Sequence, residues 1–356
     1  MNQTSTRWTL RIASFLVAAL LMWLALRGVD FDAMASTFKE ANYWWLLPMA
    51  AVTLLSHWLR AVRWSYLLDV SPRADSRAST RPVSRSNAFV SVMVGYMANY
   101  AGPRLGELIR TGNVARHERM HFSTVFGTVV VERILDMATF ALLLLTVPVI
   151  FSDFIVELTH LLVQPIMTWG DVIPLWLLGV GLLVTALVAG WFIRFLARGL
   201  ARPESRIGRM ADDFRQGILS LVRTGRAGRM VAQTLAMWAC YGLMAWLPFL
   251  LLGQNDVYGI GFIAAWGIML IGAVGVIIPS PGGIGTYHFI TIQSLSLLFA
   301  MPQEAAASYA LLTHTGQMLL YIVTGFLGLL FLGATLDVGD EQNAPSSDRS
   351  ESANAQ

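Results

Sequence analysis

The chain has little charge and almost no cysteine. Asp, Glu, Lys and Arg make up 13% of its 356 residues, while 55% are hydrophobic. An average soluble domain has about a quarter charged residues, so this composition excludes a disordered chain and an ordinary soluble enzyme. The single cysteine, Cys240, excludes an internal disulfide and a zinc site built on cysteines. The remaining class is a protein that crosses a membrane several times.

Apolar runs predict the membrane spans. We expect them at 12–26, 43–68, 122–150, 174–195, 230–252, 258–278 and 307–334. Two further runs, 88–101 and 287–300, are too short to cross, because fourteen residues of helix rise only ~21 Å against a hydrocarbon core of ~30 Å. These two runs are interpreted as half-helices. The first run also resembles a signal peptide, but charged residues separate it from the Ala-Met-Ala at 33–35, which favours an uncleaved span.

The arginines predict the orientation. Segment 69–87 holds four arginines and 194–229 holds nine, whereas 151–171 has three acids and no Lys or Arg. Since positive residues favour the cytoplasmic side, both N- and C-termini are expected there. The same arginine loops are expected to contact anionic lipid head groups rather than nucleic acid. The polar tail 335–356, with five acids, is expected to be disordered and cytoplasmic.

The number of crossings predicts a re-entrant hairpin in each half of the chain. Between the cytoplasmic segment 69–87 and the outward segment 151–171, the span 122–150 is one crossing, so 88–121 must return to the side it left. The same arithmetic makes 258–300 a re-entrant pair. Run 258–278 is also long enough to cross fully, and both possibilities remain open at this stage.

Two similar helix breaks predict an inverted repeat. Residues 100–107 read Tyr-Ala-Gly-Pro-Arg-Leu-Gly-Glu, and residues 279–286 read Pro-Ser-Pro-Gly-Gly-Ile-Gly-Thr. Each break follows an apolar run and precedes a short helix and a long span, and the two start from opposite sides. Such breaks point to a transport site, because unpaired backbone groups in lipid need protein, water or a ligand. The alternative is a pair of kinks that only pack.

Charges inside the spans suggest a polar path. Thr124, Thr128, Glu132 and Asp136 recur every four residues, and Arg133 beside them can pair with Asp136. Glu107 is an alternative partner for Arg133, or a partner for Arg110. A second stripe in the last span is formed by His314, Gln317, Tyr321 and Thr324. Charged residues within a span usually face a cavity or a partner. A purely structural ion cluster is the alternative.

The first break carries candidate phosphate ligands. Arg104, Glu107 and Arg110 are spaced three apart, and guanidinium groups bind phosphate with paired hydrogen bonds. The alternative is an interfacial helix with snorkelling arginines. Arg60 and Arg63, beside two tryptophans, are expected only to anchor the span at the interface.

The sequence therefore predicts an all-α polytopic membrane bundle with about six full spans and two broken helix pairs related as an inverted repeat. We expect one transmembrane domain over 1–334, with pseudo-repeats at about 43–150 and 230–334. The candidate substrate-binding residues are Arg104, Glu107, Arg110, Glu132, Arg133, Asp136, Gly282, Gly283, Gly285, His288, His314 and Gln317.

Three stretches of this sequence resemble one family. They are 102–110 (Gly-Pro-Arg-Leu-Gly-Glu-Leu-Ile-Arg), 131–136 (Val-Glu-Arg-Ile-Leu-Asp) and 279–285 (Pro-Ser-Pro-Gly-Gly-Ile-Gly). The family is the lysylphosphatidylglycerol synthase transmembrane region, which is flippase-like, and the resemblance covers roughly 10–335. It implies movement of lipids or lipid-linked sugars between leaflets of a prokaryotic cytoplasmic membrane. In the family an acidic residue often stands where His288 is, and an arginine near His314.

We expect a lipid translocator with a phospholipid or lipid-linked substrate, no cofactor and no bound metal. The resemblance does not include a soluble aminoacyl-transferase domain, so synthase activity is not expected. No Walker motif is present, so ATP is not expected to drive transport. The alternatives are an integral membrane enzyme acting on a polyprenyl or phospholipid phosphate, and a structural membrane subunit. No nucleophile with a positioned base supports the enzyme.

Overall fold

The computed structural model describes residues 3–73, 82–102, 104–152, 194, 206–277 and 280–343. All regular elements within these ranges are helical, which confirms the predicted all-α class. Nearly all of the expected span 174–195 lies outside the described residues, as does the tail beyond 343.

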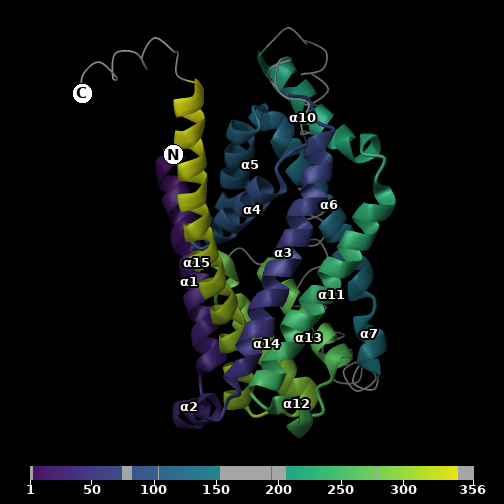
Figure 1. The fold of residues 1–356 in the computed structure, drawn as a ribbon. Coiled ribbons are helices and arrows are strands. Elements are labelled where there is room, and N and C mark those ends of the chain that lie inside the picture. The colour runs from purple at the N-terminus through teal and green to yellow at the C-terminus, as the bar shows by residue number, and fades with distance from the viewer. Residues whose placement is uncertain are drawn as a thin grey trace, which may run out of the picture.

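Among the described residues, five long helices run between the two ends of the bundle (Figure 1). They are α1 (Gln3–Leu26), α3 (Leu46–Asp69), α6 (Phe122–Leu144), α11 (Ala227–Leu251) and α15 (Gln303–Asn343). Four stretches among the described residues are long and apolar enough to cross a membrane, namely 43–69, 122–150, 227–251 and 303–330. These confirm four predicted spans. Helix α15 continues to Asn343.

Two helical hairpins enter the bundle from opposite ends and turn back halfway. The first consists of α4 (Arg85–Asn99) and α5 (Leu105–His117), and the second of α13 (Phe262–Ile277), the short η2 (Pro281–Gly283) and α14 (Thr286–Phe299). Figure 1 shows α4 and α5 in one half of the bundle and α13 and α14 in the other. Run 258–278 is therefore a half-crossing, because the 16 residues of α13 rise only ~24 Å.

Short helices lie at the two ends. At the end where the second hairpin opens lie α2 (Phe31–Lys39), η1 (Tyr43–Trp45), α7 (Val147–Ile150) and α12 (Gln254–Val257). At the opposite end, α10 (Arg206–Arg223) packs along α6. Glycines permit this contact, since a Cβ on Gly217 would lie 2.2 Å from the backbone oxygen of Thr124. The start of α1 and the end of α15 lie at the end that carries α10 (Figure 1).

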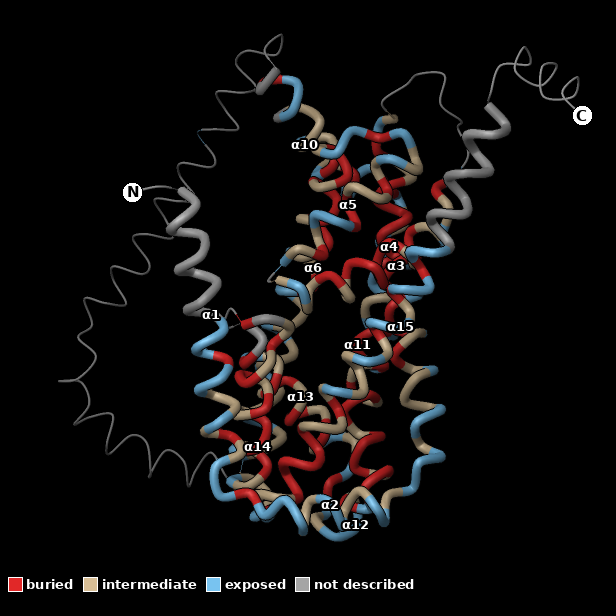
Figure 2. The backbone as a smooth tube through the Cα atoms, turned by 90° about the vertical axis from the view of Figure 1, so that its left-hand side faces the viewer, coloured by how far each residue is buried: buried red, intermediate tan, exposed pale blue. Residues whose placement is uncertain are grey.

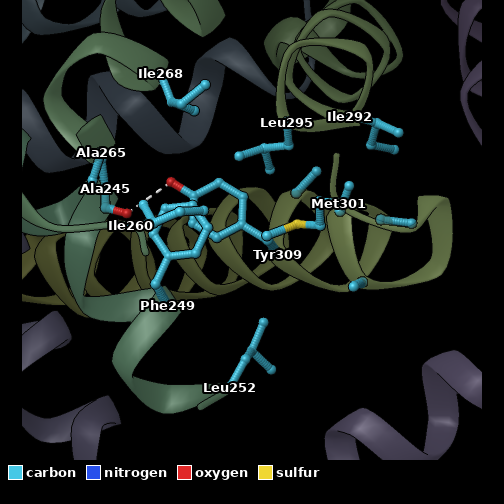
Figure 3. Packing of buried hydrophobic residues seen from close by; sticks show 14 of the residues in the cluster. Ala245, Phe249, Leu252, Ile260, Ala265, Ile268, Ile292, Leu295, Met301 and Tyr309 are labelled. Carbon is cyan, nitrogen blue, oxygen red and sulfur yellow. Dashed lines mark hydrogen bonds between the residues drawn. The ribbon is translucent and has the colours of Figure 1, made fainter. Parts of the chain in front are cut away.

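Apolar packing holds each half of the bundle together. In Figure 3, the Phe249 ring of α11 stacks on Tyr309 of α15 at 3.9 Å between centroids, and the Tyr309 hydroxyl donates to the Ala245 carbonyl at 2.7 Å. A second buried cluster surrounds Trp64 of α3. Between helices in lipid, tight van der Waals contact and internal hydrogen bonds replace the hydrophobic effect as the source of stability.

The outer surfaces of the long helices are apolar and exposed. Figure 2 shows buried residues concentrated inside the bundle, with exposed positions along α1 and α15. Leu319, Val323 and Phe326 of α15 are each more than half exposed. Exposed apolar surface of this extent is typical of a lipid-facing helix.

Candidate functional site

The two helix breaks meet inside the bundle. A Cβ on Gly282, in the second break, would lie 2.5 Å from the ring of Tyr100, in the first. His314 of α15 joins them: its Nε2 is 2.9 Å from the Gly282 carbonyl oxygen, and its ring lies 6.4 Å from that of Tyr100. The sequence predicted two breaks from opposite sides, and the structure places them in contact.

Backbone geometry explains the glycines of the second break. Gly282, Gly283 and Gly285 all have positive φ, between 60° and 82°. L-residues with side chains rarely adopt this region, so glycine is the residue these turns require. Gly285 is also pressed against α1, because a Cβ there would lie 2.2 Å from the Ala18 carbonyl oxygen. These three predicted site residues therefore shape the break through their backbone.

Arg104 starts the returning helix of the first break. It has φ 60°, which is unusual for a residue with a side chain, and it is the N-cap of α5. Its side chain is exposed and has no hydrogen bond or ion pair with any described residue. Nearby, the Asn99 side chain accepts a hydrogen bond from the Gly106 amide at 2.8 Å and so satisfies one free N–H of the helix start.

A buried ionic cluster connects α3, α5 and α6. Glu132 accepts hydrogen bonds from Arg60 and from Arg110, the latter at 3.0 Å, and Asp136 accepts from Arg60 at 2.7 Å and Arg63 at 2.5 Å. Glu132 is fully buried, and all three arginines are at most 5% exposed. The predicted inward stripe on α6 is therefore correct, with the two threonines before Glu132 also buried.

The expectation that Arg60 and Arg63 only anchor the span at the interface is wrong. Both side chains are buried inside the bundle, because the face of α3 that carries them packs against α6 and α11. Tyr241 of α11 accepts a hydrogen bond from Arg60 at 2.8 Å, and Thr234 accepts one from Arg63 at 2.8 Å. His57, Arg60 and Arg63 are spaced three residues apart and therefore lie on one face of the helix. This spacing could have indicated that the two arginines face inward together with His57.

Arg133 pairs with one of the two partners that the sequence allowed. It pairs with Glu107 of α5 at 2.8 Å rather than with Asp136, which is already held by the α3 arginines. The sequence spacing allowed either pairing, and the position of the first hairpin beside α6 decides between them.

A narrow pocket opens at this point. Its lining consists of Val92, Gly95, Tyr96, Asn99, Gly106, Glu107, Arg110 and Arg133. Arg110 presents Nε and Nη2 atoms that are buried and without a hydrogen-bond partner. One carboxylate oxygen of Glu107 and the Nε of Arg133 are also unpaired. Buried polar atoms of this kind are costly unless a ligand or water pairs with them, so the pocket has the chemistry of a binding site.

The charges around the pocket do not balance. The cluster contains four guanidinium groups, from Arg60, Arg63, Arg110 and Arg133, and three carboxylates, from Glu107, Glu132 and Asp136. One positive charge is in excess. The Arg110 guanidinium also lies 4.9 Å from the centre of the Trp64 ring, which offsets part of its charge.

Aromatic residues between α3, α4 and α15 link the cluster to the breaks. His57 Nε2 is 2.9 Å from the Tyr321 hydroxyl, and both rings contact Tyr96, at 4.3 and 4.9 Å between centroids. One turn further along α4, Tyr100 faces His314. We call His57, Tyr96, Tyr321, Tyr100 and His314 the aromatic ladder. The predicted stripe on α15 supplies two of its members; sequence analysis missed His57 and Tyr96.

His288 and His314 form a pair at the second break. Their ring centroids are 4.7 Å apart, and Tyr287 stacks on His314 at 5.5 Å. His288 is 2% exposed, and its Nδ1 is buried without a partner. Gln317, the remaining predicted site residue, is half-buried and makes no side-chain hydrogen bond with a described residue.

Residues 11–325 match a family model described as lysylphosphatidylglycerol synthase TM region. The chain is similar to UPF0104 membrane protein MJ1595 of Methanocaldococcus jannaschii, with 23% identity covering 90% of this chain and 95% of that protein. It is also similar to glycosyltransferase AglD of Haloferax volcanii, with 23% identity covering 97% of this chain. The chain spans 58% of the length of AglD. No solved structure matches the chain significantly.

Proposed function

Since the chain belongs to the lysylphosphatidylglycerol synthase TM region family, we propose that it moves a lipid with an anionic head group from one membrane leaflet to the other. The lipid is a phospholipid or a lipid-linked sugar. The head group passes through the polar interior where the two hairpins meet, while the acyl or polyprenyl chains stay in the surrounding lipid.

One observation carries this proposal: the unpaired buried atoms of Arg110 at a pocket with an excess positive charge. A guanidinium group offers paired donors to phosphate oxygens, and a buried, uncompensated charge favours a ligand of opposite charge. An excess of one charge is balanced by one phosphodiester. A phosphodiester is the group that joins a lipid to an alcohol or sugar head group.

The meeting of the two breaks supports a passage between the leaflets. Broken helices that reach the middle of a membrane from opposite sides occur in transporters whose halves rock around a central site. We infer that Arg104, at the start of α5 and without a partner among the described residues, is a further phosphate contact on the same helix as Arg110. Along the aromatic ladder, hydroxyl and imidazole groups offer hydrogen bonds to a passing head group.

The orientation and location belong to the same proposal. The arginine-rich segments 69–87 and 194–229 face the cytoplasm of a prokaryotic cell and contact anionic head groups there. The two relatives named above are archaeal. The first hairpin then opens to the cytoplasm and the second to the outside.

The name of one relative favours a second candidate, an enzyme that acts on a lipid-linked sugar or phosphate. The word glycosyltransferase describes the whole of that relative, of which this chain spans 58%. Sugar transfer or phosphate release by the purified chain would support the enzyme over the translocator.

The deciding experiment follows leaflet exchange of fluorescent phosphatidylglycerol in vesicles with purified protein. Phosphatidylcholine is the zwitterionic comparison, because its choline group balances the charge of its phosphodiester. We expect Arg110→Gln to slow exchange about 10- to 100-fold, from the ~1.5–3 kcal/mol of hydrogen bonds to a charged group. Arg116→Gln is the matched control, because Arg116 is exposed near the end of the same helix. Equal rates for both variants and the wild type would reject the role of Arg110 in binding the head group. A wild-type rate no faster than that of protein-free vesicles would reject the translocator.

A further inference from the structure

The histidine pair, His288 and His314, lies in surroundings without an acidic partner. Helix α14 packs against α13, α15 and α1. Neither α13, α14 nor the described side chains of α1 include a carboxylate. In α15 the nearest acid is Glu304, ten residues before His314 and so about three turns away.

The aromatic groups that face the pair are phenols. Tyr287 contacts both imidazole rings, at 5.8 Å for His288 and 5.5 Å for His314, and Tyr100 faces His314 at 6.4 Å. A buried imidazolium without a carboxylate is costly, so the pair favours its uncharged form until an anion arrives.

The hydrogen bonds of the pair leave ring nitrogens that can accept one additional proton. His314 Nε2 contacts the Gly282 carbonyl, and that oxygen can only accept, so this nitrogen carries the proton. The second nitrogen of His314 is then the acceptor of the neutral ring. His288 Nδ1 has no hydrogen-bond partner among the described residues. The pair therefore combines a ring fixed by the break with a ring whose buried nitrogen is unsatisfied.

We propose that the histidine pair is a proton site that is filled when the anionic head group enters, so that a proton moves together with the lipid. This rests on the proposed function and names its coupling ion. One neutral imidazole takes a proton from water on the side where the lipid enters. The phosphodiester leaves Arg110 and pairs with the imidazolium while the breaks change their exposure from one side to the other. The proton returns to water on the other side when the lipid leaves.

The position of the pair supports this coupling. His314 holds the Gly282 carbonyl of the second break and faces Tyr100 of the first, so a charge on this ring acts on both breaks at their point of contact. Phosphate oxygens and an imidazolium attract strongly where water is excluded. The two charges together cost far less to bury than either alone.

The test counts protons during binding of dihexanoyl-phosphatidylglycerol, a short soluble phospholipid. Isothermal calorimetry near neutral pH in two buffers of different ionisation enthalpy gives the number of protons taken up. We expect about one proton per bound lipid for the wild-type chain, from linkage between protonation and binding. His288→Gln and His314→Gln are each expected to reduce this number toward zero. His121→Gln, at an exposed histidine before α6, is expected to leave it unchanged.

A proton count near zero for the wild-type protein would overturn the inference without any variant. Vesicles with an imposed pH gradient provide the second measurement: phosphatidylglycerol should move faster from the acidic to the alkaline side, and a protonophore should abolish this difference. Leaflet exchange that ignores both the gradient and the protonophore would reject the proton site and leave the translocator standing. A complete absence of binding and exchange would reject the translocator and the proton site together.

Discussion

Replacing Glu132 by glutamine removes the carboxylate on which three arginines converge. Its two oxygens lie within 4.0 Å of guanidinium nitrogens of Arg60, Arg63 and Arg110, and the residue is fully buried. Glutamine has almost the same shape and keeps one carbonyl acceptor. The main change is the loss of one negative charge, which raises the excess positive charge of the cluster from one to two.

The expected cost follows from the burial. Removing one partner of a buried ion pair destabilises a protein by ~3–5 kcal/mol, because the remaining charge is left in a medium of low dielectric constant. That corresponds to a roughly 100- to 4,000-fold shift of the unfolding equilibrium. The exposed pair Asp212–Arg215, with side chains 44% and 47% exposed, offers a comparison, since exposed pairs contribute about 0–1 kcal/mol.

The assay is unfolding in mixed micelles with increasing dodecyl sulfate, followed by tryptophan fluorescence. We expect Glu132→Gln to lose several kcal/mol and Asp212→Asn less than about 1 kcal/mol. The double variant Glu132→Gln with Arg110→Gln restores the original excess of one charge, so it should lose less than the sum of the two single variants. A loss at Glu132 no greater than at Asp212, or additive losses in the double variant, would refute the account of the cluster.

Two further predictions concern the hairpins. Gly106→Ala should prevent close packing of α4 and α5, because the new Cβ would lie 2.1 Å from the Gly95 carbonyl oxygen. We expect a lower folded yield and a lower thermal stability for this variant. Gly112→Ala on the same helix is the control: its Cβ would meet nothing within 4 Å, so the change should be neutral or stabilising. Cysteines at Ala101 and Ile284, in a cysteine-free background, should react with membrane-impermeant reagents from opposite sides of sealed vesicles, and labelling of both from one side would contradict the opposed hairpins.

The lengths of apolar runs determined much of the architecture. A run of fourteen residues cannot cross a bilayer, and this limit predicted the half-helices that the structure has at α4 and α14. The sequence also predicted the inward side of α6, because Glu132 and Asp136 are one helical turn apart. Such properties belong to a single segment, so they can be read without knowing its neighbours.

Only the tertiary structure decided which charges pair. Arg60 bonds to Glu132 across 72 positions of the chain and to Asp136 across 76, and these contacts depend on how α3 and α6 are aligned. The same is true of Arg133 with Glu107, and of Tyr100 against Gly282. Composition and periodicity indicate which face of a helix is polar. The partner of each charged side chain, the rotation of each helix about its axis and its depth in the membrane are set by the packing of several helices at once. The polar interior of this protein is therefore a property of the assembled bundle, whereas its division into spans and half-spans follows from the sequence alone.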